Sequence, residues 1–457
     1  MGLGRIMAMI VEQLAGWGRL PLALVPQARP TTATELTKAW VLPAGRVSRG
    51  LGRAYGDAAL PVEGGFAVSA LGMARMISFD EATGLLVAES GVSLAEIIEV
   101  FLPRGWFLPV VPGTKFVTLG GAVAADIHGK NHHVDGTFGA HVAWLDLLLP
   151  VGGSLRCSEG HEAAVFRATI GGMGLTGHIE RVAIRLRRVP SAWCKVRTLR
   201  GRDLAHTLEL LAANDGSYRH TVAWMDCVAV GDSLGRGVVM LGNEATPAEL
   251  PAKNAATPHR LPGRPKLAVP FDLPEWALGP LSVGAFNACY YGLAKDAEKL
   301  VDFEKFFFPL DTIRDWNRIY GRRGFAQFQA YFPDATAEAG LRACLDAIGR
   351  SRQASFLAVL KRSGPANDYP LSFLDLGYTL ALDLPGPAKT LAPLMAELDG
   401  ILAAYRGKVY FAKDAFVSPS LIPAMYPRLD EFRRVQRALD PSGVVRSLLS
   451  TRLKLHD

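Results

Sequence analysis

The sequence predicts an α+β protein with at least two lobes. At 457 residues the chain is longer than the ~250–300 residues at which a single hydrophobic core stops growing. From about Leu36 to Val189, short apolar runs alternate with glycine turns and with one clear helix pattern. Apolar residues make up 49% of the chain, and no run approaches the ~18 apolar residues of a membrane span. The composition therefore indicates a soluble globular protein.

The stretch GVSLAEIIEVFLPRGW predicts a helix that begins after Ser93. Ser93 and Glu96 have the spacing of a capping box, in which each side chain bonds the other residue's backbone N–H. The apolar residues from Leu94 to Phe101 then recur at i, i+3, i+4 and i+7, which gives the helix one buried face. Pro103 and Gly105 end it.

Three further segments have strand patterns. HVAWLDLLLP (141–150) and RVAIRLRRV (181–189) are apolar and β-branched, and the second alternates as a half-buried strand does. GKVYFAKDAF (407–416) predicts one more strand near the C-terminus. The first 25 residues lack the basic region and cleavage site of a signal peptide. We interpret them as mature protein that starts with a docking helix, with contact to a membrane surface as the alternative.

The segment from Leu250 to Pro280 has a different character, with seven prolines and no hydrophobic period. A structureless stretch of this length inside a compact domain is typical of a functional flap or of disorder. Mixed helix and strand patterns resume after it and continue through Tyr405.

Charge and cysteine content narrow the function classes. The net charge is +7, which favours anionic partners such as phosphorylated substrates or anionic lipid. The basic residues are scattered, without a basic block or an aromatic-basic signature, so we expect no nucleic acid. The cysteines are odd in number and never in C-x-x-C spacing, which favours a reducing compartment over a disulfide framework or a zinc ribbon. These are Cys157, Cys194, Cys227, Cys289 and Cys344.

The stretch GGAVAADIHGKNHH (120–133) raises a choice between a metal site and a phosphate cradle. His128 and His132 are four residues apart, but Lys130 would place a positive charge beside the ion, and no carboxylate or cysteine completes a ligand set. We therefore expect no metal. Side-chain-free Gly120 and Gly121 instead allow backbone N–H groups to approach phosphate oxygens.

Two other glycine-rich segments were tested against known phosphate motifs. RGLGRAYGDAA (49–59) does not have the G-x-G-x-x-G spacing. GGMGLTG (171–177) does, but a strand pattern follows it where a dinucleotide-binding motif requires a helix. No Walker A sequence and no G-x-S-x-G elbow occur. The unconventional glycine loops, with arginine and histidine nearby, still suggest a large phosphate-bearing cofactor.

Several segments, in this order, resemble the decaprenylphosphoryl-β-D-ribose 2'-oxidase family, a group of FAD-linked oxidases of the vanillyl-alcohol-oxidase type. They are SRGLGRAYGDAAL, VPGTKFVTLGGAVAADIHGKNHH, FRATIGGMGLTGHIERV, WNRIYGRRGFAQFQAYFP, PLSF and YFAKDAF, and they span nearly the whole chain. The combination of IHGKNHH with GRAYGD is far more specific than any single glycine motif.

The resemblance implies an architecture and a reaction. It implies a two-lobed flavoprotein with an FAD-binding domain in two segments (1–191 and 408–457) and an inserted substrate domain with an antiparallel sheet (192–407), which carries a flexible 250–280 loop. It implies oxidation of the 2'-hydroxyl of a polyprenylphosphoryl-β-D-ribofuranose to a ketone, the first half of epimerisation to an arabinofuranose donor. An NADH-dependent keto-reductase partner would complete the epimerisation.

The resemblance also implies the site residues. Non-covalent FAD would contact the two glycine loops and their neighbours: Arg49, Gly50, Leu51, Gly52, Arg53, Ala54, Tyr55, Gly113, Thr114, Thr118, Gly120, Gly121, Ala122, His128, Gly129, Asn131, His132, Ile179 and Lys413. The substrate would contact Lys130, Gln327, Gln329, Lys361, Thr379 and Ala381. Lysines suit a phosphate, and glutamine amides can orient sugar hydroxyls.

Three residues receive catalytic roles in this reading. Lys413 is the expected residue at the reacting hydroxyl, as a base or as the cation beside the developing alkoxide, and His128 is the alternative base. Tyr55 shapes the pocket. It also stands where covalently flavinylated relatives carry the linking histidine, so we expect no covalent bond to the flavin.

Two positions depart from the family pattern, because Thr379 and Ala381 stand where well-known members have asparagine and cysteine. An FAD-dependent alditol or aldonolactone oxidase acting on a soluble sugar therefore remains the alternative function, and a non-catalytic flavin-binding subunit is a third possibility. The prolines of 250–280 and the basic surface favour the lipid substrate. We expect a cytoplasmic or peripheral membrane location, with the side of the membrane left open.

Overall fold

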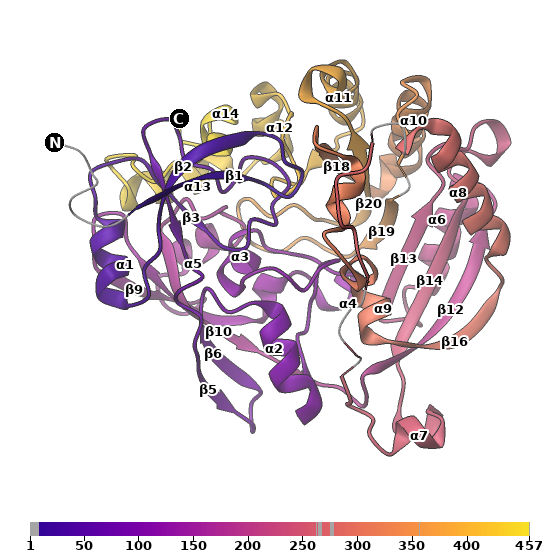
Figure 1. Ribbon diagram of the computed structural model, residues 1–457, viewed down its shortest axis with the longest axis horizontal. Helices are drawn as coiled ribbons and strands as arrows, with labels where there is room; N and C mark the ends of the chain where they lie inside the picture. Colours follow the sequence, from indigo (N-terminus) through magenta and orange to yellow (C-terminus); the bar gives the residue numbers. More distant parts are fainter. Residues whose placement is uncertain (1–8, 262, 264–266, 275–277, 356, 457) are drawn as a thin grey trace.

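The computed structural model describes residues 9–261, 263, 267–274, 278–355 and 357–456. Figure 1 shows two lobes, which are distinguished by the sheets they contain. The first lobe holds a four-stranded and a five-stranded sheet, and the second lobe holds an eight-stranded sheet. Mixed helices and antiparallel sheets confirm the α+β class.

The four-stranded sheet of the first lobe begins the described chain. Its strands, in the order β1-β2-β4-β3, are β1 (Ile10–Ala15), β2 (Leu22–Ala28), β4 (Phe66–Ser69) and β3 (Arg46–Arg49), with α1 (Ala33–Trp40) between β2 and β3. The expected docking helix is wrong in the described part, because β1 and β2 pair as antiparallel strands. Pro21 and Pro26 explain this, since each removes a helix hydrogen bond. Residues 1–8 lie outside the described residues.

The five-stranded sheet is antiparallel throughout and has the order β5-β6-β10-β8-β9. Its strands are β5 (Met76–Asp80), β6 (Leu85–Glu89), β10 (His178–Arg185), β8 (Val142–Leu148) and β9 (Ser154–Cys157). Helix α2 (Leu94–Phe101) follows β6, and its Ser93–Glu96 capping box confirms the prediction. The strand at β10 is also confirmed, with Val182 and Ile184 0% exposed and Arg181 and Arg185 exposed. Its central place in the sheet buries Ala183 as well.

The eight-stranded sheet of the second lobe is antiparallel, as predicted, with the order β16-β12-β14-β13-β19-β20-β18-β21. Its strands are β12 (Trp193–Gly201), β13 (His220–Met225), β14 (Gly237–Glu244), β16 (Ala297–Asp302), β18 (Phe325–Pro333), β19 (Ala358–Ser363), β20 (Gly377–Pro385) and β21 (Lys408–Val409). Helices α6 (Leu204–Asn214), α10 (Ala337–Arg350) and α11 (Ala388–Ala404) pack against it (Figure 1). Phe328 and Leu380 belong to this helix-covered core, which leaves the alternate residues Gln327, Gln329 and Ala381 facing the first lobe.

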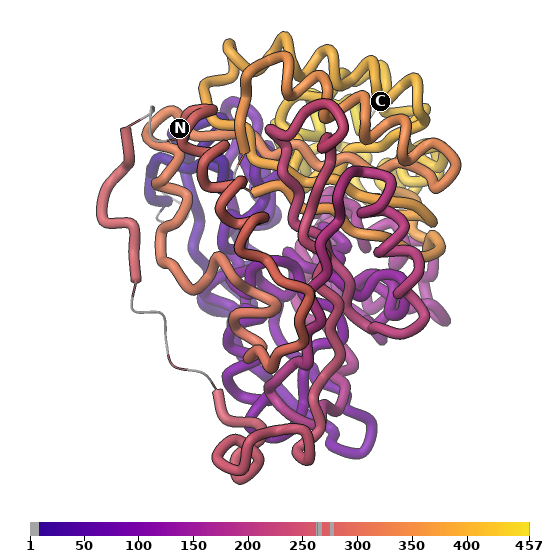
Figure 2. The backbone as a smooth tube through the Cα atoms, turned by 90° about the vertical axis from the view of Figure 1, so that its right-hand side faces the viewer, coloured from indigo at the N-terminus to yellow at the C-terminus, as the bar shows by residue number. Residues whose placement is uncertain are grey.

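The proline-rich segment is not structureless in its described parts. It contains α7 (Ala252–Ala255) and β15 (Leu267–Ala268), which pairs with β17 (Ile313–Arg314). Figure 2 shows these pieces along one edge of the molecule. Residues 262, 264–266 and 275–277 lie outside the described residues, and the expected flexibility stays a prediction. Helix α8 (Pro280–Leu293) comes directly after this segment.

The C-terminal segment leaves the second sheet and returns to the first lobe. The expected strand over 407–416 is only β21, because the Lys413 and Asp414 amides bond the Tyr410 carbonyl in a turn. Val445 then bridges to Arg46 of β3, and Arg452 pairs with Asp57 and Asp414. This return agrees with the two-segment domain, whose boundaries at 191 and 407 stay predictions.

The described chain has further α-helices and one more pair of strands. They are the helices α3 (Leu119–Ala124), α4 (His132–Asp135), α5 (Ala163–Thr169), α9 (Phe303–Phe307), α12 (Ile422–Met425), α13 (Leu429–Leu439) and α14 (Leu448–Arg452), and the paired strands β7 (Trp106–Phe107) and β11 (Arg187–Arg188).

Candidate active site

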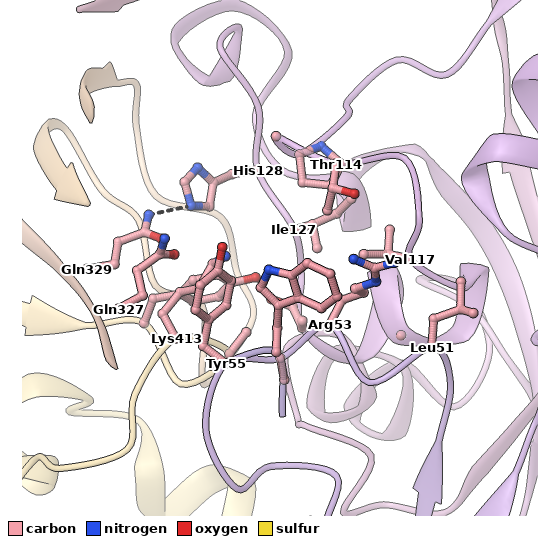
Figure 3. A pocket seen from close by; sticks show the side chains of 18 of the residues that line it. Leu51, Arg53, Tyr55, Thr114, Val117, Ile127, His128, Gln327, Gln329 and Lys413 are labelled. Carbon is pink, nitrogen blue, oxygen red and sulfur yellow. Dashed lines mark hydrogen bonds between the residues drawn. The ribbon is translucent and has the colours of Figure 1, made fainter. Parts of the chain in front are cut away.

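A cavity of about 510 Å³ lies between the glycine loops of the first lobe and the open face of the eight-stranded sheet. This volume is within the range of small-molecule and cofactor sites. Figure 3 shows Leu51, Arg53, Thr114 and Val117 at one end of the labelled group. Tyr55, His128, Gln327, Gln329 and Lys413 are grouped at the other end. The first-lobe wall is rich in backbone, because five of its lining residues are glycines: Gly50, Gly52, Gly113, Gly120 and Gly121.

The first glycine loop follows β3 and needs glycine for two different reasons. Gly52 has a φ of 65°, in the left-handed region that other residues rarely adopt. A Cβ on Gly50 would lie 2.2 Å from Thr118 Oγ1, so this glycine lets the two glycine loops pack together. The Arg53 guanidinium then stacks 3.8 Å from the centre of the Trp17 ring. The loop is thereby fixed with its backbone along the cavity.

The second glycine loop is the start of a helix and not a Gly-Gly turn. Thr118 caps α3 by accepting a hydrogen bond from the Gly121 N–H at 3.3 Å, and Gly120 and Gly121 lie in the first turn. The N–H groups of Leu119 and Gly120 donate to the Val92 and Ser90 carbonyls, so the start of α3 offers a ligand close approach to its backbone but no free N–H donor. On the loop before it, a Cβ on Gly113 would meet no protein atom within 4 Å, which leaves room for a ligand.

Two buried polar atoms on this wall lack protein partners and support a cofactor there. His178 bonds Ser48 through Nδ1 at 2.9 Å, but its Nε2 has no hydrogen-bond partner in the described structure. Ser90 Oγ is equally unsatisfied. Both residues line the cavity. Because buried polar groups are normally paired, these atoms suit a ligand with many donors and acceptors, such as FAD.

The opposite wall brings the predicted catalytic residues together. The Lys413 Nζ lies 3.7 Å from the centre of the Tyr55 ring. Desolvation lowers the pKa of Lys413 to about 7, while the Asp383 carboxylate opposes that shift and Lys361 adds to it. An amine with this pKa exchanges protons near neutral pH, as an acid–base group requires. Desolvation raises the pKa of Tyr55, which keeps its phenol neutral.

His128 is buried and is engaged by Gln329. The Gln329 Nε2 lies 2.9 Å from the His128 Nε2 (Figure 3). An amide N–H can only donate, so the ring Nε2 accepts and the proton of the neutral ring sits on Nδ1. Desolvation lowers the pKa of His128 well below its usual value, and Lys361, His132 and Lys413 add to that shift. The histidine is therefore neutral, with the lone pair of Nε2 already used.

Two more lysines reach the same cavity. Desolvation lowers the pKa of Lys130 to about 7 and that of Lys361 to about 8, with Lys361 contributing to the shift of Lys130. The Lys130 ammonium donates to the Phe306 carbonyl and lies 4.3 Å from the Phe306 ring centre. Three lysines in one cavity form a site for an anionic group.

Asp383 is a titratable residue behind this wall that the sequence did not predict. It is 0% exposed, and its two oxygens accept hydrogen bonds from Gln327 Nε2 at 2.5 Å and from the Tyr320 hydroxyl at 2.9 Å. Desolvation raises its pKa to about 6 against the effect of both donors and of Lys413. A signal was present, because alternation in GYTLALDLP places Asp383 on the same face as Ala381.

Aromatic residues at the edge of the cavity were also missed. Trp224, Phe286 and Tyr290 line it, and the Trp224 and Tyr290 rings are 4.6 Å apart. Trp17 and Trp316 line it from the first lobe and from the segment before β18. Their positions follow from tertiary packing, and no local pattern in the sequence marks them.

Most predicted site residues line the cavity, and four do not. Ala122 is 0% exposed on the core face of α3. Asn131 donates to the Pro109 carbonyl and to Asp135, and His132 accepts from the Gly364 N–H, so both tie the loop to its surroundings. Thr379 lies on β20 opposite Tyr331 and Lys361. Apart from these four, every predicted cofactor and substrate residue lies on the cavity wall.

No cluster of three or more His, Cys, Asp or Glu side chains suited to a metal ion occurs among the described residues. No helix in the described part of the chain is long and apolar enough to cross a membrane. The cysteines are free thiols, four of them buried and Cys289 exposed.

The fold and the cavity define the class of an FAD-dependent oxidoreductase, and comparisons with known proteins agree. Residues 28–158 match the FAD binding domain family. The chain is 34% identical to decaprenylphosphoryl-β-D-ribose oxidase of Mycolicibacterium smegmatis, over 97% of this chain and 98% of that protein. It is 33% identical to an uncharacterized protein of Streptomyces coelicolor, over 80% of this chain and all of that protein. A putative D-arabinono-1,4-lactone oxidase of Neurospora crassa is 29% identical over 24% of this chain and 20% of its own length.

The chain belongs to the decaprenylphosphoryl-β-D-ribose oxidase family. FAD is its cofactor, and its fold is the two-lobed vanillyl-alcohol-oxidase type. The residues with the unsatisfied atoms, Ser90 and His178, and the open space at Gly113 lie where this cofactor would be held.

Proposed function

We propose that this protein oxidises the 2'-hydroxyl of a polyprenylphosphoryl-β-D-ribofuranose to a ketone. The observation that carries the proposal is that Lys130 and Lys361, as ammonium groups for a phosphate, and Lys413, as the candidate base, all line the cavity that also has the cofactor wall. Ammonium groups in a partly desolvated cavity favour a phosphate. Gln327 and Gln329 beside them supply amides for sugar hydroxyls. A phosphate and a sugar in one substrate match this set better than a neutral alditol does.

The proposed step divides between cofactor and protein. Bound FAD supplies the acceptor for the hydride that leaves the carbinol carbon. The neutral Lys413 amine takes the proton from the hydroxyl, because its pKa of about 7 leaves a large unprotonated fraction near neutral pH. His128 holds the Gln329 amide in place for the substrate and is not the base, because its Nε2 already accepts the hydrogen bond from Gln329. Tyr55 excludes water from the amine by covering it with its ring.

Helix α8 supports a lipid-linked substrate over a soluble one. Its 14 residues, PLSVGAFNACYYGL, contain no charged side chain. Val283 is buried, but Leu281 is 91% and Leu293 73% exposed. Phe286 and Tyr290, on the same helix, are exposed and also line the cavity. An exposed apolar helix at the mouth of a substrate cavity is suited to a lipid surface or to a polyprenyl tail.

The product chemistry implies a second enzyme. A 2'-ketone becomes the arabinose epimer only when hydride is added to the opposite face. An NADH-dependent keto-reductase is therefore the partner that we propose, with a peripheral membrane location for both reactions.

Anaerobic rapid mixing tests the proposed substrate. The holoenzyme is mixed with a polyprenylphosphoryl-β-D-ribofuranose, free ribose, an alditol and an aldonolactone, and the flavin absorbance band is followed. The proposal predicts fastest bleaching with the lipid-linked ribose. Faster bleaching with the alditol or lactone would instead identify a soluble-sugar oxidase. No bleaching with any compound would indicate a flavin-binding subunit without this activity.

Vesicle flotation tests the role of α8 separately. The double variant Leu281→Glu, Leu293→Glu should lose binding to anionic vesicles that the native protein retains. The matched control is Val151→Glu, Val230→Glu, which places the same charges at valines that are 67% and 70% exposed elsewhere. Equal binding by both variants would remove α8 from the argument for a lipid substrate.

A further inference from the structure

Three polar residues of the first lobe line the cavity without belonging to the predicted FAD contacts: Ser48, Ser90 and His178. Ser48 lies on β3 of the four-stranded sheet, whereas Ser90 follows β6 and His178 begins β10 of the five-stranded sheet. The Ser48 hydroxyl and the His178 ring are hydrogen-bonded, and the Ser90 N–H donates to the carbonyl of Glu180, two residues after His178. The two sheets of the first lobe thus bring these side chains to one part of the cavity wall.

The His178 ring is held in place but is not fully paired. Ser48 Oγ lies 2.9 Å from its Nδ1, and the Trp40 ring meets it edge-on with ring centres 5.4 Å apart. The residue is 1% exposed, and its Nε2 has no hydrogen-bond partner in the described structure. Desolvation lowers the pKa of His178 to about 4, so the ring is neutral and carries one N–H. Because an unpaired buried polar atom is costly, Nε2 indicates a ligand partner.

The Ser90 hydroxyl gives the same indication independently. The Ser90 carbonyl accepts a hydrogen bond from the Gly120 N–H at 2.8 Å, and its own N–H is also paired, whereas its Oγ is buried and unpaired among the described residues. A Cβ on Gly120 would lie 2.7 Å from the Ser90 Cβ, so the serine sits directly against the first turn of α3. The unpaired atoms therefore lie beside the second glycine loop.

The neighbours of these residues indicate which part of FAD they would meet. Trp40, Glu180 and Gly120 all belong to the first lobe, whereas the flavin ring has to reach Lys413 at the opposite wall. That placement of the ring rests on the proposed function. FAD is elongated, with the ring at one end and adenosine diphosphate at the other. The phosphate oxygens, ribose hydroxyls and adenine nitrogens of the diphosphate half can pair with both donors and acceptors.

We propose that Ser48, Ser90 and His178 form a subsite for the adenosine diphosphate half of FAD, to which His178 Nε2 and Ser90 Oγ are hydrogen-bonded. The Ser48 hydroxyl can donate or accept, so it supports the ring tautomer that the ligand requires at Nε2. These residues take no part in the redox step. Their role is to retain the cofactor, and they should leave the electronic properties of the flavin ring unchanged.

The test is fluorescence titration of FAD into the apoprotein, followed by the visible spectrum and the midpoint potential of the bound flavin. His178→Phe keeps an aromatic ring beside Trp40 but removes both ring nitrogens. The Kd for FAD should rise about 10-fold, the scale of a hydrogen bond lost from a buried polar group, with the spectrum and the potential unchanged. His161→Phe, at an exposed histidine outside the cavity, is the matched control and should bind FAD like the native protein.

Ser90→Ala guards against misfolding caused by the larger ring, because it removes only a hydroxyl. Its Kd for FAD should rise by about 3- to 10-fold, the range of one net hydrogen bond. Unchanged FAD affinity in Ser90→Ala, or in a folded His178→Phe protein, would overturn the proposal. A shifted flavin spectrum or potential would also overturn it, since the residues would then act on the ring. The titration needs no substrate, so its outcome is independent of whether the polyprenylphosphoryl ribose reduces the flavin.

Discussion

The two walls of the cavity are lined by different kinds of groups. The first-lobe wall is rich in glycine backbone, with Gly50 and Gly52 on a loop that packs against Thr118 and with Gly113 on the loop before α3. The opposite wall carries long titratable side chains from the sheet and from the turn after β21, with the pKa of Lys361 lowered to about 8 and that of Lys413 to about 7. From this difference we expect the first wall to hold the cofactor mainly by shape and the second to act on the substrate through charge.

Blocking the open space at Gly113 should have the largest effect and should act on the cofactor wall alone. Gly113→Val places carbon atoms where the structure has no protein atom within 4 Å. If the cofactor occupies that space, FAD affinity should fall ~10²-fold, the upper end of the overpacking cost. The purified protein's FAD-to-protein absorbance ratio is the measurement. Gly216→Val, at another glycine with open surroundings, is the control and should keep its FAD.

Removing a charge from the sheet wall should leave FAD bound and weaken the substrate. Lys361→Met keeps the length of the side chain but deletes an ammonium that lines the cavity. A charged hydrogen bond contributes about 1.5–3 kcal/mol, so KM for a phosphorylated substrate should rise at least ~10-fold with kcat less affected. Lys195→Met, on the second sheet but outside the cavity, serves as the comparison. A changed FAD content in Lys361→Met would show that FAD binding and substrate binding are not divided between the two walls.

The pH dependence of flavin reduction should follow the protonation state of Lys413. The base form of Lys413 is the unprotonated amine, so the rate should rise with pH and reach half its plateau at about pH 7. Below that pH the amine is protonated and cannot accept the substrate proton. Stopped-flow reduction from pH 5.5 to 9 is the measurement. A rate that falls as pH rises would mean that Lys413 acts as a cation.

The last of these predictions is that FAD is bound without a covalent link to the protein. Tyr55 lies in the first glycine loop, where the family resemblance implies the linking histidine of covalently flavinylated relatives. Desolvation raises its pKa, so it is a poor nucleophile. Acid precipitation should leave the yellow colour in the supernatant. A yellow pellet would contradict the prediction.

The glycine-rich wall could be predicted from the sequence more fully than the wall of titratable side chains. Glycine loops, the Ser93–Glu96 cap and the antiparallel second sheet have local or family signatures, and the structure contains them. Asp383 was missed because its importance depends on Tyr320 and Gln327, which are 63 and 56 residues away. The expected strand at 407–416 failed because a turn at Tyr410 ends it, and this turn is what brings Lys413 to the cavity. The expected N-terminal helix is absent because Pro21 and Pro26 disfavour a helix in this segment, whose residues form the paired strands β1 and β2 instead.

The proton-accepting role of Lys413 is the central claim, and one comparison tests it most directly. Lys413→Ala and His128→Gln are each loaded with FAD and mixed anaerobically with the polyprenylphosphoryl ribose. We predict that Lys413→Ala keeps its FAD but reduces it ~10²-fold or more slowly, the scale of a lost acid–base group, and that His128→Gln loses less. Reduction of Lys413→Ala at the native rate, with His128→Gln inactive, would contradict the account and make the histidine the base.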